Sequence, residues 1–459
     1  METTSVAAPS APRLRRALTL WDLILYGVIV IQPVAPMSVF GVLSNRGHGH
    51  VVTTILIAMV AMLFTAISYG KMARAYPSAG SAFTYVGQEI NPALGYVTGW
   101  SMVMDYMLNP MICTIWISQQ AHVFAPGVPY GAWAFFFALV FTVLNVQGVK
   151  TSARVNTALA AGMGLVIAIF FVAAARYIFG HSHDGAAFFT RPFYDPASWN
   201  TKAVLGGTSV AVLTYIGFDG ISTLSEEAEN PRRNILLATV LTCLVIGILS
   251  AVEVYAAQLI WPSSEPYPNV DTAFTFVAGR AWLPLFAIVG FTLVVANFGS
   301  GMGAQLGAAR LLYGMGRSNA LPKSFFGAVD AKRRVPRNNV LFVGGLALAG
   351  AFLLPAIAGA ATGYELGANL LNFGALIAFM GVNAAAFVRY YLHEPKKTLG
   401  NLLPPVLGFV ICFFLWINLS SKALVFGTIW MAVGIAVGAW KTKGFRGNLV
   451  DFELPPEED

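Results

Sequence analysis

Residues 216–234 read IGFDGISTLSEEAENPRRN, and they follow the apolar run AVLGGTSVAVLTY of residues 203–215. The apolar run is typical of a membrane helix, but Gly217 and Gly220 then bracket Asp219. Glycine leaves helical geometry without a steric penalty, and an aspartate inside a bilayer is costly. The stretch therefore predicts a membrane helix that is interrupted near its middle and ends in a charged segment.

The composition of the chain is that of a membrane protein. Of its 459 residues, 57% are hydrophobic and 11% are charged, whereas soluble domains contain about 25% charged residues. Apolar runs of about 20 residues, long enough to cross a bilayer, recur along the chain. We find no nucleic-acid motif, ATP-binding loop or metal-ligand pattern. We therefore expect an integral, multi-pass protein of the plasma membrane, in bacteria the inner membrane, that uses no cofactor and no metal.

Twelve apolar segments predict an all-α membrane protein. Their approximate limits are 19–43, 51–69, 92–121, 131–147, 156–179, 203–226, 235–260, 282–312, 339–358, 366–388, 402–420 and 424–441. With this assignment, 22 of the 28 lysines and arginines lie on one side of the membrane and 6 on the other. Basic residues accumulate on the cytoplasmic side. The tails 1–18 and 442–459 are therefore both predicted to be cytoplasmic.

Two of the predicted spans are interrupted, the first and the sixth. In the first, Pro33 and Pro36 each remove a backbone donor. Interruptions at matching places in two halves point to the binding site of a transporter, and an offset of five spans inserts the two halves in opposite orientations. We therefore predict an inverted repeat of helices 1–5 (19–180) and helices 6–10 (203–389), followed by helices 11 and 12 (402–441).

Several segments resemble one known family. GFDGISTLSEEAENPRRN (217–234) resembles the sixth-span signature of the amino acid–polyamine–organocation permeases. Further matches are AISYGKMARAYPSAGSAFTYV (66–86), GWSMVMDYMLNPM (99–111), ARLLYGMGRSNALP (309–322) and NFGALIAF (372–379). Within the family, PMSVFG (36–41), MDYMLNPM (104–111) and TLSEE (223–227) are most similar to the putrescine importers. The resemblance covers essentially the whole chain. It implies the leucine-transporter-type fold and proton- or exchange-coupled transport of amino acids or polyamines.

The two interruptions predict a pocket at the middle of the membrane. Free carbonyls of a half-helix that ends near Tyr215, and free N–H groups of one that begins near Ile221, are expected to face it. The resemblance implies that Phe218 is a gate over the substrate. The candidate substrate contacts are Gln32, Val34, Ala35, Met37, Ser38, Asp105, Tyr106, Asn109, Tyr215, Gly217, Phe218, Asp219, Asn297 and Asn372. Of these, Tyr215, Asn297 and Asn372 equally suit polar contacts between helices.

Two carboxylates carry the predicted chemistry. Asp105 suits either the counter-charge of an amine or a hydrogen bond to a neighbouring helix. Asp219 has three open roles: it caps the second half-helix, pairs with a substrate ammonium, or carries a proton. Some proton-coupled relatives have a lysine in span five, but this chain has Met163 near that position. Proton coupling is therefore assigned to Asp105 and Asp219.

Charged residues after the sixth-span break predict a gate at the cytoplasmic end. Glu226 and Glu227 precede Arg232 and Arg233 closely. The carboxylates could pair with basic residues elsewhere on that face, such as Arg74 or Arg154, and ion pairs there could break as the mouth opens. The alternative is a solvated helix end.

The first-span break differs from that of the amino acid permeases in the family. Those proteins usually have a glycine-rich break whose N–H groups bind the substrate carboxylate. Here QPVAPMS (32–38) contains two prolines, which have no N–H. Fewer donors remain for a carboxylate, and this favours a substrate rich in amines.

These features predict a secondary active transporter. We expect it to import a small amine-containing solute, a putrescine-like polyamine or an amino acid, with protons as the coupling ion. A monomer or a homodimer in the lipid bilayer is expected. The alternatives are an amino acid permease, an amino acid/polyamine exchanger and a membrane sensor derived from a transporter. An enzyme or a channel is disfavoured, because neither a catalytic constellation nor a repeated selectivity segment is present.

Overall fold

The fold is entirely helical in the part of the chain that the structure describes. The computed structural model describes residues 18–76, 81–148, 153–225, 228–317, 321–330, 333, 335–359, 362–442 and 444–445. Apart from an isolated bridge between Leu18 and Ala228, all regular structure in these residues is helical. The predicted all-α class is confirmed.

The helices fall into the order that the sequence predicts, with short helices added between the spans. The long helices of the first part are α1 (Leu20–Ile31), α2 (Ala35–Arg46), α3 (Val51–Ala75), α5 (Pro92–Phe124), α6 (Tyr130–Gln147) and α7 (Ala153–Gly180). Those of the second part are α9 (Thr201–Ala211), α10 (Pro231–Ile260), α12 (Pro284–Arg317), α14 (Arg337–Ala358), α15 (Gly363–Phe387), α16 (Leu399–Ile417) and α17 (Ser421–Lys441).

Short elements connect or continue these helices. They are the α-helices α4 (Ser81–Glu89), α8 (Ala186–Thr190), α11 (Ala273–Ala281) and α13 (Lys323–Phe326), the 3-10 helices η1 (Val212–Thr214) and η2 (Phe218–Leu224), and the π-helix η3 (Val388–Leu392). The sequence analysis did not predict α4 or α11, although both contact the elements that form the candidate site.

The number of spans agrees only in part with the prediction. By length and composition, ten helices in the described ranges suit a membrane span, and α1 with α2 form an eleventh that is bent by 47°. The 33-residue helix α5 is not among them, because polar residues such as Asp105 and Asn109 lower the mean hydropathy of its middle. The twelve-helix count and the inverted repeat therefore stay predictions.

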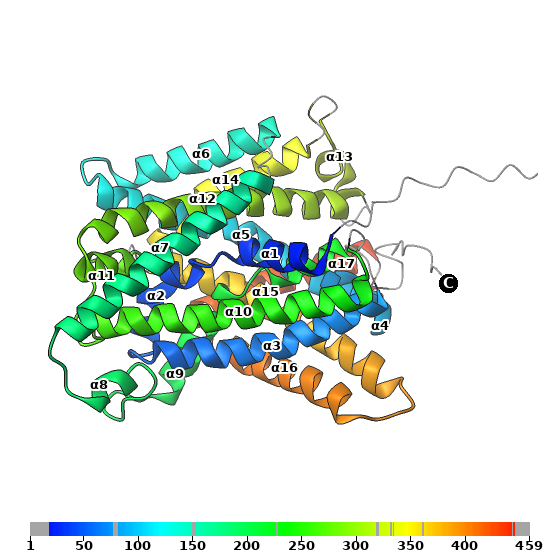
Figure 1. Ribbon diagram of the computed structural model, residues 1–459. Coiled ribbons are helices and arrows are strands. Elements are labelled where there is room, and N and C mark those ends of the chain that lie inside the picture. Colours follow the sequence, from blue (N-terminus) through cyan, green and yellow to red (C-terminus); the bar gives the residue numbers. More distant parts are fainter. Residues whose placement is uncertain are drawn as a thin grey trace, which may run out of the picture.

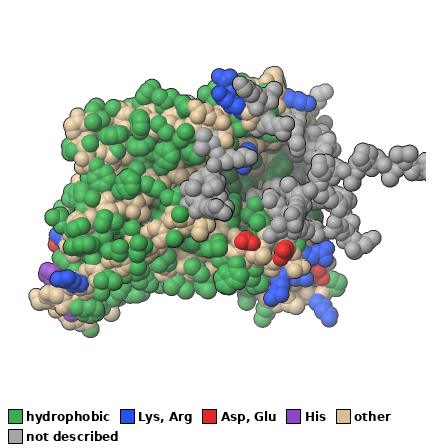
Figure 2. Space-filling view, turned by 45° about the horizontal axis from the view of Figure 1, so that its top comes forward, with side chains coloured by type: hydrophobic (Ala, Val, Ile, Leu, Met, Phe, Trp, Pro, Cys, Tyr) green, Lys and Arg blue, Asp and Glu red, His purple; other side chains and the backbone are tan. Residues whose placement is uncertain are grey.

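The long helices run between two ends of the molecule (Figure 1). α8 and α11 lie at one end, and α4 and α13 lie at the other. In Figure 2, the lysine and arginine side chains in view gather mostly at the end of α4 and α13, and the flank between the ends is largely hydrophobic. We call the end of α4 and α13 the predicted cytoplasmic end and the opposite end the predicted outer end.

Small residues let the central helices approach closely. A Cβ on Gly70 of α3 would lie 2.6 Å from the Cα of Leu236 in α10. A Cβ on Gly27 of α1 would lie 2.5 Å from Cδ1 of Ile221 in η2. Such contacts are typical of helix packing in membranes, where close van der Waals approach replaces the hydrophobic effect as the driving force. The Gly27 contact brings the first half of span one against the broken part of span six, and the Gly70 contact brings α3 against α10.

Candidate functional site

The first span breaks where the sequence analysis predicts. α1 ends at Ile31, Gln32 adopts a left-handed φ of 70°, and α2 begins at Ala35. Pro33 lies in the break, and Pro36 lies in the first turn of α2, where a missing N–H leaves no hydrogen bond unmade. The backbone N–H of Ala35 donates to the carbonyl of Gln32, and that of Met37 donates to the carbonyl of Val34. Two of the predicted donors are therefore already used.

The sixth span breaks with a different local geometry from the prediction. α9 ends at Ala211 and continues as η1, and Gly217 then adopts a φ of 119°. The second half is the 3-10 helix η2 from Phe218, and not an α-helix from Ile221. The hydroxyl groups of Ser222 and Ser225 each donate to a carbonyl three residues earlier, a spacing that suits the 3-10 repeat.

The two breaks face each other. A Cβ on Gly217 would lie 3.0 Å from Cγ1 of Val30 and 3.4 Å from Cγ1 of Ile31, at the end of α1. A Cβ on Gly220 would lie 3.8 Å from the hydroxyl oxygen of Tyr26. The glycine turn of span six therefore packs directly against the last turn of α1, and a side chain at either position would narrow the space between them.

Asp219 is bonded to its own turn. Its Oδ1 accepts the backbone N–H of Gly217 at 3.2 Å, and its own N–H and that of Gly220 also interact with the carboxylate. This arrangement corresponds to the capping role among the three that the sequence leaves open. It leaves the negative charge of the carboxylate inside the bundle, so the other two roles stay open as well.

Asp105 of α5 and Asp219 form a pair of buried carboxylates. Each is 6% exposed, and they are close enough to interact electrostatically. None of the ion pairs between described residues includes either of them. Tyr69 of α3 and Tyr106 of α5 interact with both carboxylates. The Tyr69 hydroxyl has no hydrogen-bond partner among the described residues, so it is available to a ligand.

Phe218 belongs to an aromatic cluster that lies between the broken part of span six and α4. Its ring centroid lies 5.5 Å from that of Tyr69 and 5.3 Å from that of Phe379 in α15, and Tyr69 also contacts Tyr85 of α4. The hydroxyl groups of Ser81 and Ser222 are 3.0 Å apart and connect α4 to η2. Because α4 lies at the predicted cytoplasmic end (Figure 1), this cluster separates the carboxylate pair from that end.

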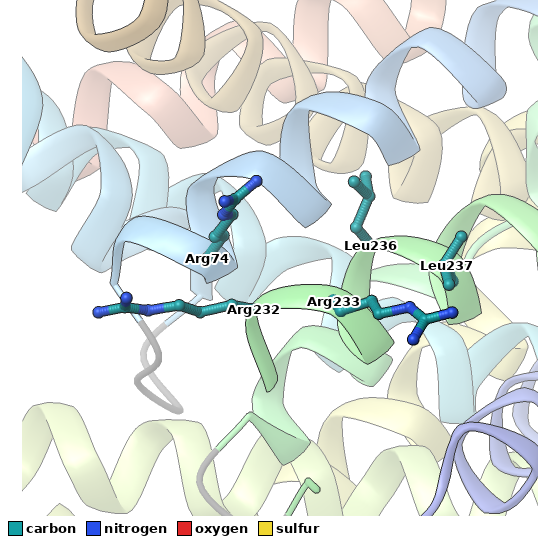
Figure 3. A pocket seen from close by; sticks show the side chains of 5 residues that line it. All are labelled: Arg74, Arg232, Arg233, Leu236 and Leu237. Carbon is teal, nitrogen blue, oxygen red and sulfur yellow. The ribbon is translucent and has the colours of Figure 1, made fainter. Parts of the chain in front are cut away.

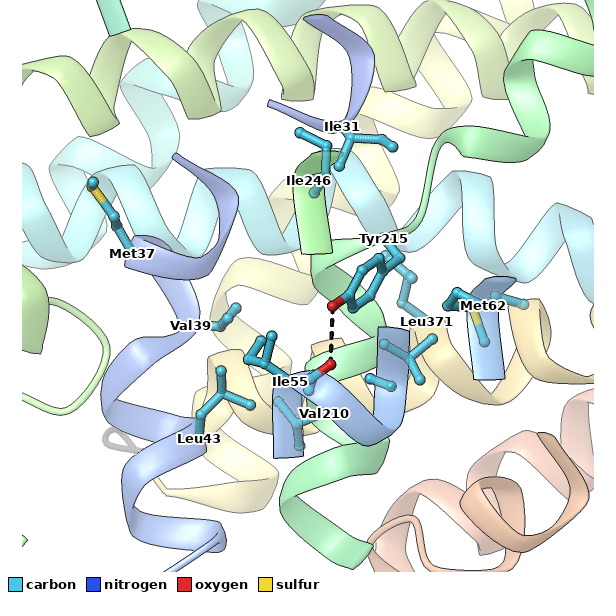
Figure 4. Close-up of a cluster of buried hydrophobic side chains, with 14 of the residues drawn as sticks. Ile31, Met37, Val39, Leu43, Ile55, Met62, Val210, Tyr215, Ile246 and Leu371 are labelled. Atoms are coloured by element: carbon cyan, nitrogen blue, oxygen red, sulfur yellow. Dashed lines mark hydrogen bonds between the residues drawn. The ribbon is translucent and has the colours of Figure 1, made fainter. Parts of the chain in front are cut away.

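Three predicted substrate contacts bond to neighbouring helices in this structure. The Tyr215 hydroxyl donates to the carbonyl of Ile55 in α3 at 2.9 Å (Figure 4). Asn372 donates to the carbonyl of Ser209 at 2.7 Å. Asn297 donates to the hydroxyl of Ser38 at 3.0 Å. These bonds correspond to the helix-contact alternative, because each side chain is turned to another helix.

The remaining candidate substrate contacts belong to span one and span three, and their side chains differ in burial and in hydrogen bonding. The Gln32 side chain donates to the carbonyl of Ala296 in α12. Tyr106 is half-buried, and its ring lies 3.4 Å from the position of a Cβ on Gly307. Asn109 accepts a hydrogen bond from the Cys113 thiol. Val34, Met37 and Ser38 are buried, and Ala35 is half-buried.

Of the predicted gate residues, only Arg232 and Arg233 lie within the described residues. Arg232 and Arg233, at the start of α10, line a 490 Å³ pocket with Arg74, Leu236 and Leu237. Figure 3 shows that the three guanidinium groups point in different directions. Glu226 and Glu227 lie outside the described residues, as does the side chain of Arg154, so their predicted ion pairs stay predictions.

An ion-pair network that the sequence analysis missed lies at the same end. The Glu89 carboxylate, on the last residue of α4, pairs with Arg389 of η3 at 2.6 Å and accepts the Tyr76 hydroxyl at 2.6 Å. The Glu89 side chain is 4% exposed. This network joins the end of α3, α4 and the end of span ten, so it closes part of the cytoplasmic end. Glu89 and Arg389 are 300 positions apart in the chain, and no local pattern connects them.

A second network closes the predicted outer end. The Trp116 indole of α5 donates to the carbonyl of Ser38 in α2 at 3.0 Å and to the carbonyl of Asp271, which precedes α11, at 2.7 Å. With the Asn297–Ser38 bond, it joins α2, α5, α12 and the segment before α11. The carboxylate pair is thus enclosed by polar contacts on one side and by aromatic rings on the other.

Comparison with known proteins places this arrangement among transporters. The amino acid permease family matches residues 33–447. The low-affinity putrescine importer PlaP of Escherichia coli (strain K12) is 35% identical over an alignment of 457 positions that covers 97% of each chain. The branched-chain amino acid permease BcaP of Bacillus subtilis (strain 168) is 25% identical and covers 94% of each chain. A solved structure of the Eremococcus coleocola manganese transporter is similar in fold, with a TM-score of 0.54, 12% identity, and coverage of 95% of this chain and 97% of that chain.

Proposed function

Because the chain belongs to the amino acid permease family, we propose that it is a secondary active transporter that imports a putrescine-like polyamine across the bacterial inner membrane. The similarity to a putrescine importer over nearly the whole chain supports this substrate class. The basic residues on one side support an orientation with both termini in the cytoplasm.

The observation that carries the proposal is the pair of Asp105 and Asp219 beside the two facing breaks. Two carboxylates in a low-dielectric interior repel each other, and burial makes an unpaired charge costly. A bound cation removes both penalties. A diamine supplies an ammonium group and several N–H donors, and the Tyr69 hydroxyl can add a hydrogen bond.

The backbone of the first-span break supports amine recognition over carboxylate recognition. The N–H groups of Ala35 and Met37 are bound within the break, and the prolines at 33 and 36 have none. An α-carboxylate therefore meets few free donors here. The rival substrate class, an amino acid, would need donors from other elements.

Alternating access follows from the two closures. In the proposed cycle, the Trp116 network opens to admit substrate, and the aromatic cluster around Phe218 and the Glu89–Arg389 pair open to release it. In the proposed cycle the site takes up one proton from the outer medium together with the amine, because buried charges that repel each other are unfavourable. Substrate and proton together then neutralise the site during import. Both are released to the cytoplasm, and the empty site returns without the proton.

The proposal is tested by uptake of labelled putrescine into proteoliposomes. Asp105→Asn removes one negative charge from the site and is expected to abolish accumulation against a gradient. Asp184→Asn is the matched control, because Asp184 is an exposed residue at the predicted outer end and pairs with Arg191.

Wild-type uptake rates in correctly inserted Asp105→Asn protein would show that Asp105 is not part of the substrate site. Wild-type uptake of amino acids without competition by putrescine would favour the amino acid permease instead, and saturable binding without uptake would favour a sensor.

A further inference from the structure

A buried carboxylate at the predicted outer end has no assigned function. Asp271 lies in the segment between α10 and α11 and is 2% exposed. Its backbone is fully engaged, since its N–H donates to Oδ1 of Asn269 at 2.9 Å and its carbonyl accepts the Trp116 indole. Its side-chain Oδ1 has no hydrogen-bond partner among the described residues. A buried polar atom without a hydrogen bond lowers the stability of the folded protein by about 1–3 kcal/mol.

The surroundings of Asp271 contain a second carboxylate and no cation that pairs with it. Glu365, in the first turn of α15, interacts electrostatically with Asp271, but the Glu365 carboxylate is itself paired with Arg46. None of the ion pairs between described residues includes Asp271. Burial, reinforced by the Glu365 charge, raises the pKa of Asp271 to about 8. At neutral pH the closed state therefore holds a proton on this carboxyl group.

Among the described residues, the other titratable groups that interact with Asp271 are tyrosines, and the nearby cation Arg46 is already paired with Glu365. Tyr130 of α6 and Tyr364 of α15 interact with Asp271, and both are neutral as phenols. The Tyr130 hydroxyl already donates to the carbonyl of Ala351. A cation bound next to Asp271 would therefore form an ion pair that the carboxylate does not make with any described residue.

Asp271 is also tied to the element that follows the first-span break. The Trp116 indole bridges the carbonyl of Asp271 and the carbonyl of Ser38, which lies in α2 four residues after Val34. Opening of the predicted outer end has to separate these elements. In the proposed transport cycle, such a separation would expose the Asp271 carboxylate, which is 2% exposed in this structure, to substrate from the medium.

We propose that the buried carboxylate of Asp271 forms an external subsite that binds a primary ammonium group of the substrate before it enters the central site. This inference rests on the proposed function. The ammonium takes the place of the proton: the carboxylic acid releases its proton to the medium and the carboxylate accepts N–H bonds from the amine. When the substrate moves inward, the carboxylate takes up a proton again. The exchange is neutral in charge and protons, so it recognises the substrate without driving transport.

The test compares Asp271→Asn with wild type in right-side-out proteoliposomes, with putrescine as the probe. The amide keeps the shape of the side chain but cannot pair with an ammonium, so the KM for external putrescine is expected to rise about tenfold or more, as for a lost charged hydrogen bond. The maximal rate stays near that of wild type. Because protons compete for Asp271, the ratio of variant to wild-type KM rises as the external pH is raised from about 6 to about 8. Glu265→Gln is the matched control, since Glu265 is a more exposed carboxylate at the same end that pairs with Arg280.

Two outcomes separate this inference from the proposed function. If wild-type protein takes up no amine, the proposed function itself fails. If wild-type protein imports putrescine and Asp271→Asn has the same external KM at every pH, the subsite is overturned. An equal rise in KM for putrescine applied at the cytoplasmic face also overturns it, because an external subsite acts from one side only.

Thermal unfolding of the purified proteins gives a readout that does not depend on transport. The folded wild type keeps a proton on Asp271 that the unfolded chain releases, so Asp271 lowers stability progressively between about pH 4 and about pH 8. Asp271→Asn lacks this effect. The Tm of the variant relative to wild type is expected to rise over that range, and a constant difference would show that Asp271 is ionised in the folded protein.

Discussion

At the scale of single residues, Asp219 combines two tasks that the sequence leaves as alternatives. Its Oδ1 closes the turn at Gly217, and its carboxylate interacts electrostatically with that of Asp105. A hydrogen bond to the turn needs only an acceptor oxygen, whereas an ammonium group needs the negative charge. The two tasks can therefore be separated by one substitution.

Asp219→Asn tests this separation. The amide oxygen can still accept the Gly217 N–H, so we expect a Tm close to that of wild type. The charge is lost, and the KM for putrescine is expected to rise at least about tenfold, since bonds to charged groups contribute about 1.5–3 kcal/mol. Asp219→Ala, which removes the acceptor as well, is expected to lower the Tm. Normal putrescine uptake in the asparagine variant would restrict Asp219 to capping.

At the scale of elements, α4 connects the sixth-span break to the cytoplasmic closure. Ser81 at its start contacts Ser222 of η2, and Glu89 at its end pairs with Arg389. Removing one partner of a buried ion pair leaves the other uncompensated. The Arg389 side chain is 40% exposed, so water can solvate its charge when Glu89 is replaced. We therefore expect loss of the ion pair to weaken the closure at the predicted cytoplasmic end more than it lowers the free energy of unfolding.

Glu89→Gln is expected to shift the protein toward a state that is open at the cytoplasmic end. A cysteine placed at Ser222, in a chain whose three native cysteines are alanine, should then react several-fold faster with a polar thiol reagent added from that side. Glu394→Gln is the control, because Glu394 is exposed in the following loop. Equal labelling rates in Glu89→Gln and wild type would show that the ion pair does not hold the closure.

At the scale of the whole molecule, the proposed coupling of substrate import to proton import can be measured as the substrate gradient that a pH gradient produces. Each pH unit corresponds to 1.36 kcal/mol per proton. If one proton enters with each substrate, an inward gradient of one pH unit at zero net membrane potential is expected to drive about tenfold accumulation. A sodium gradient without a pH gradient is expected to drive none. Strict dependence on sodium, or accumulation only when a second amine is exchanged, would refute proton symport.

The sequence alone indicated the helical class, the family and the place of both breaks. Gly217, Gly220, Pro33 and Pro36 act on their own backbone, so their effect is visible without any neighbour. The family resemblance in residues 217–234 is likewise local, and the match over residues 33–447 confirms it. A charged residue in an apolar run is also visible from sequence, which is why the sequence indicates Asp105 and Asp219 as candidate site residues.

Only the tertiary structure decided which groups meet. The electrostatic interactions of Asp105 with Asp219 and of Asp271 with Glu365, and the close approach of Gly217 to Val30, join residues far apart in the chain. The sequence likewise left open that Tyr215 and Asn372 bond to neighbouring helices and that the second half of span six is a 3-10 helix. Periodicity and propensity describe what a residue does to its own segment, whereas burial, pairing and the satisfaction of polar groups depend on helices that only folding brings together.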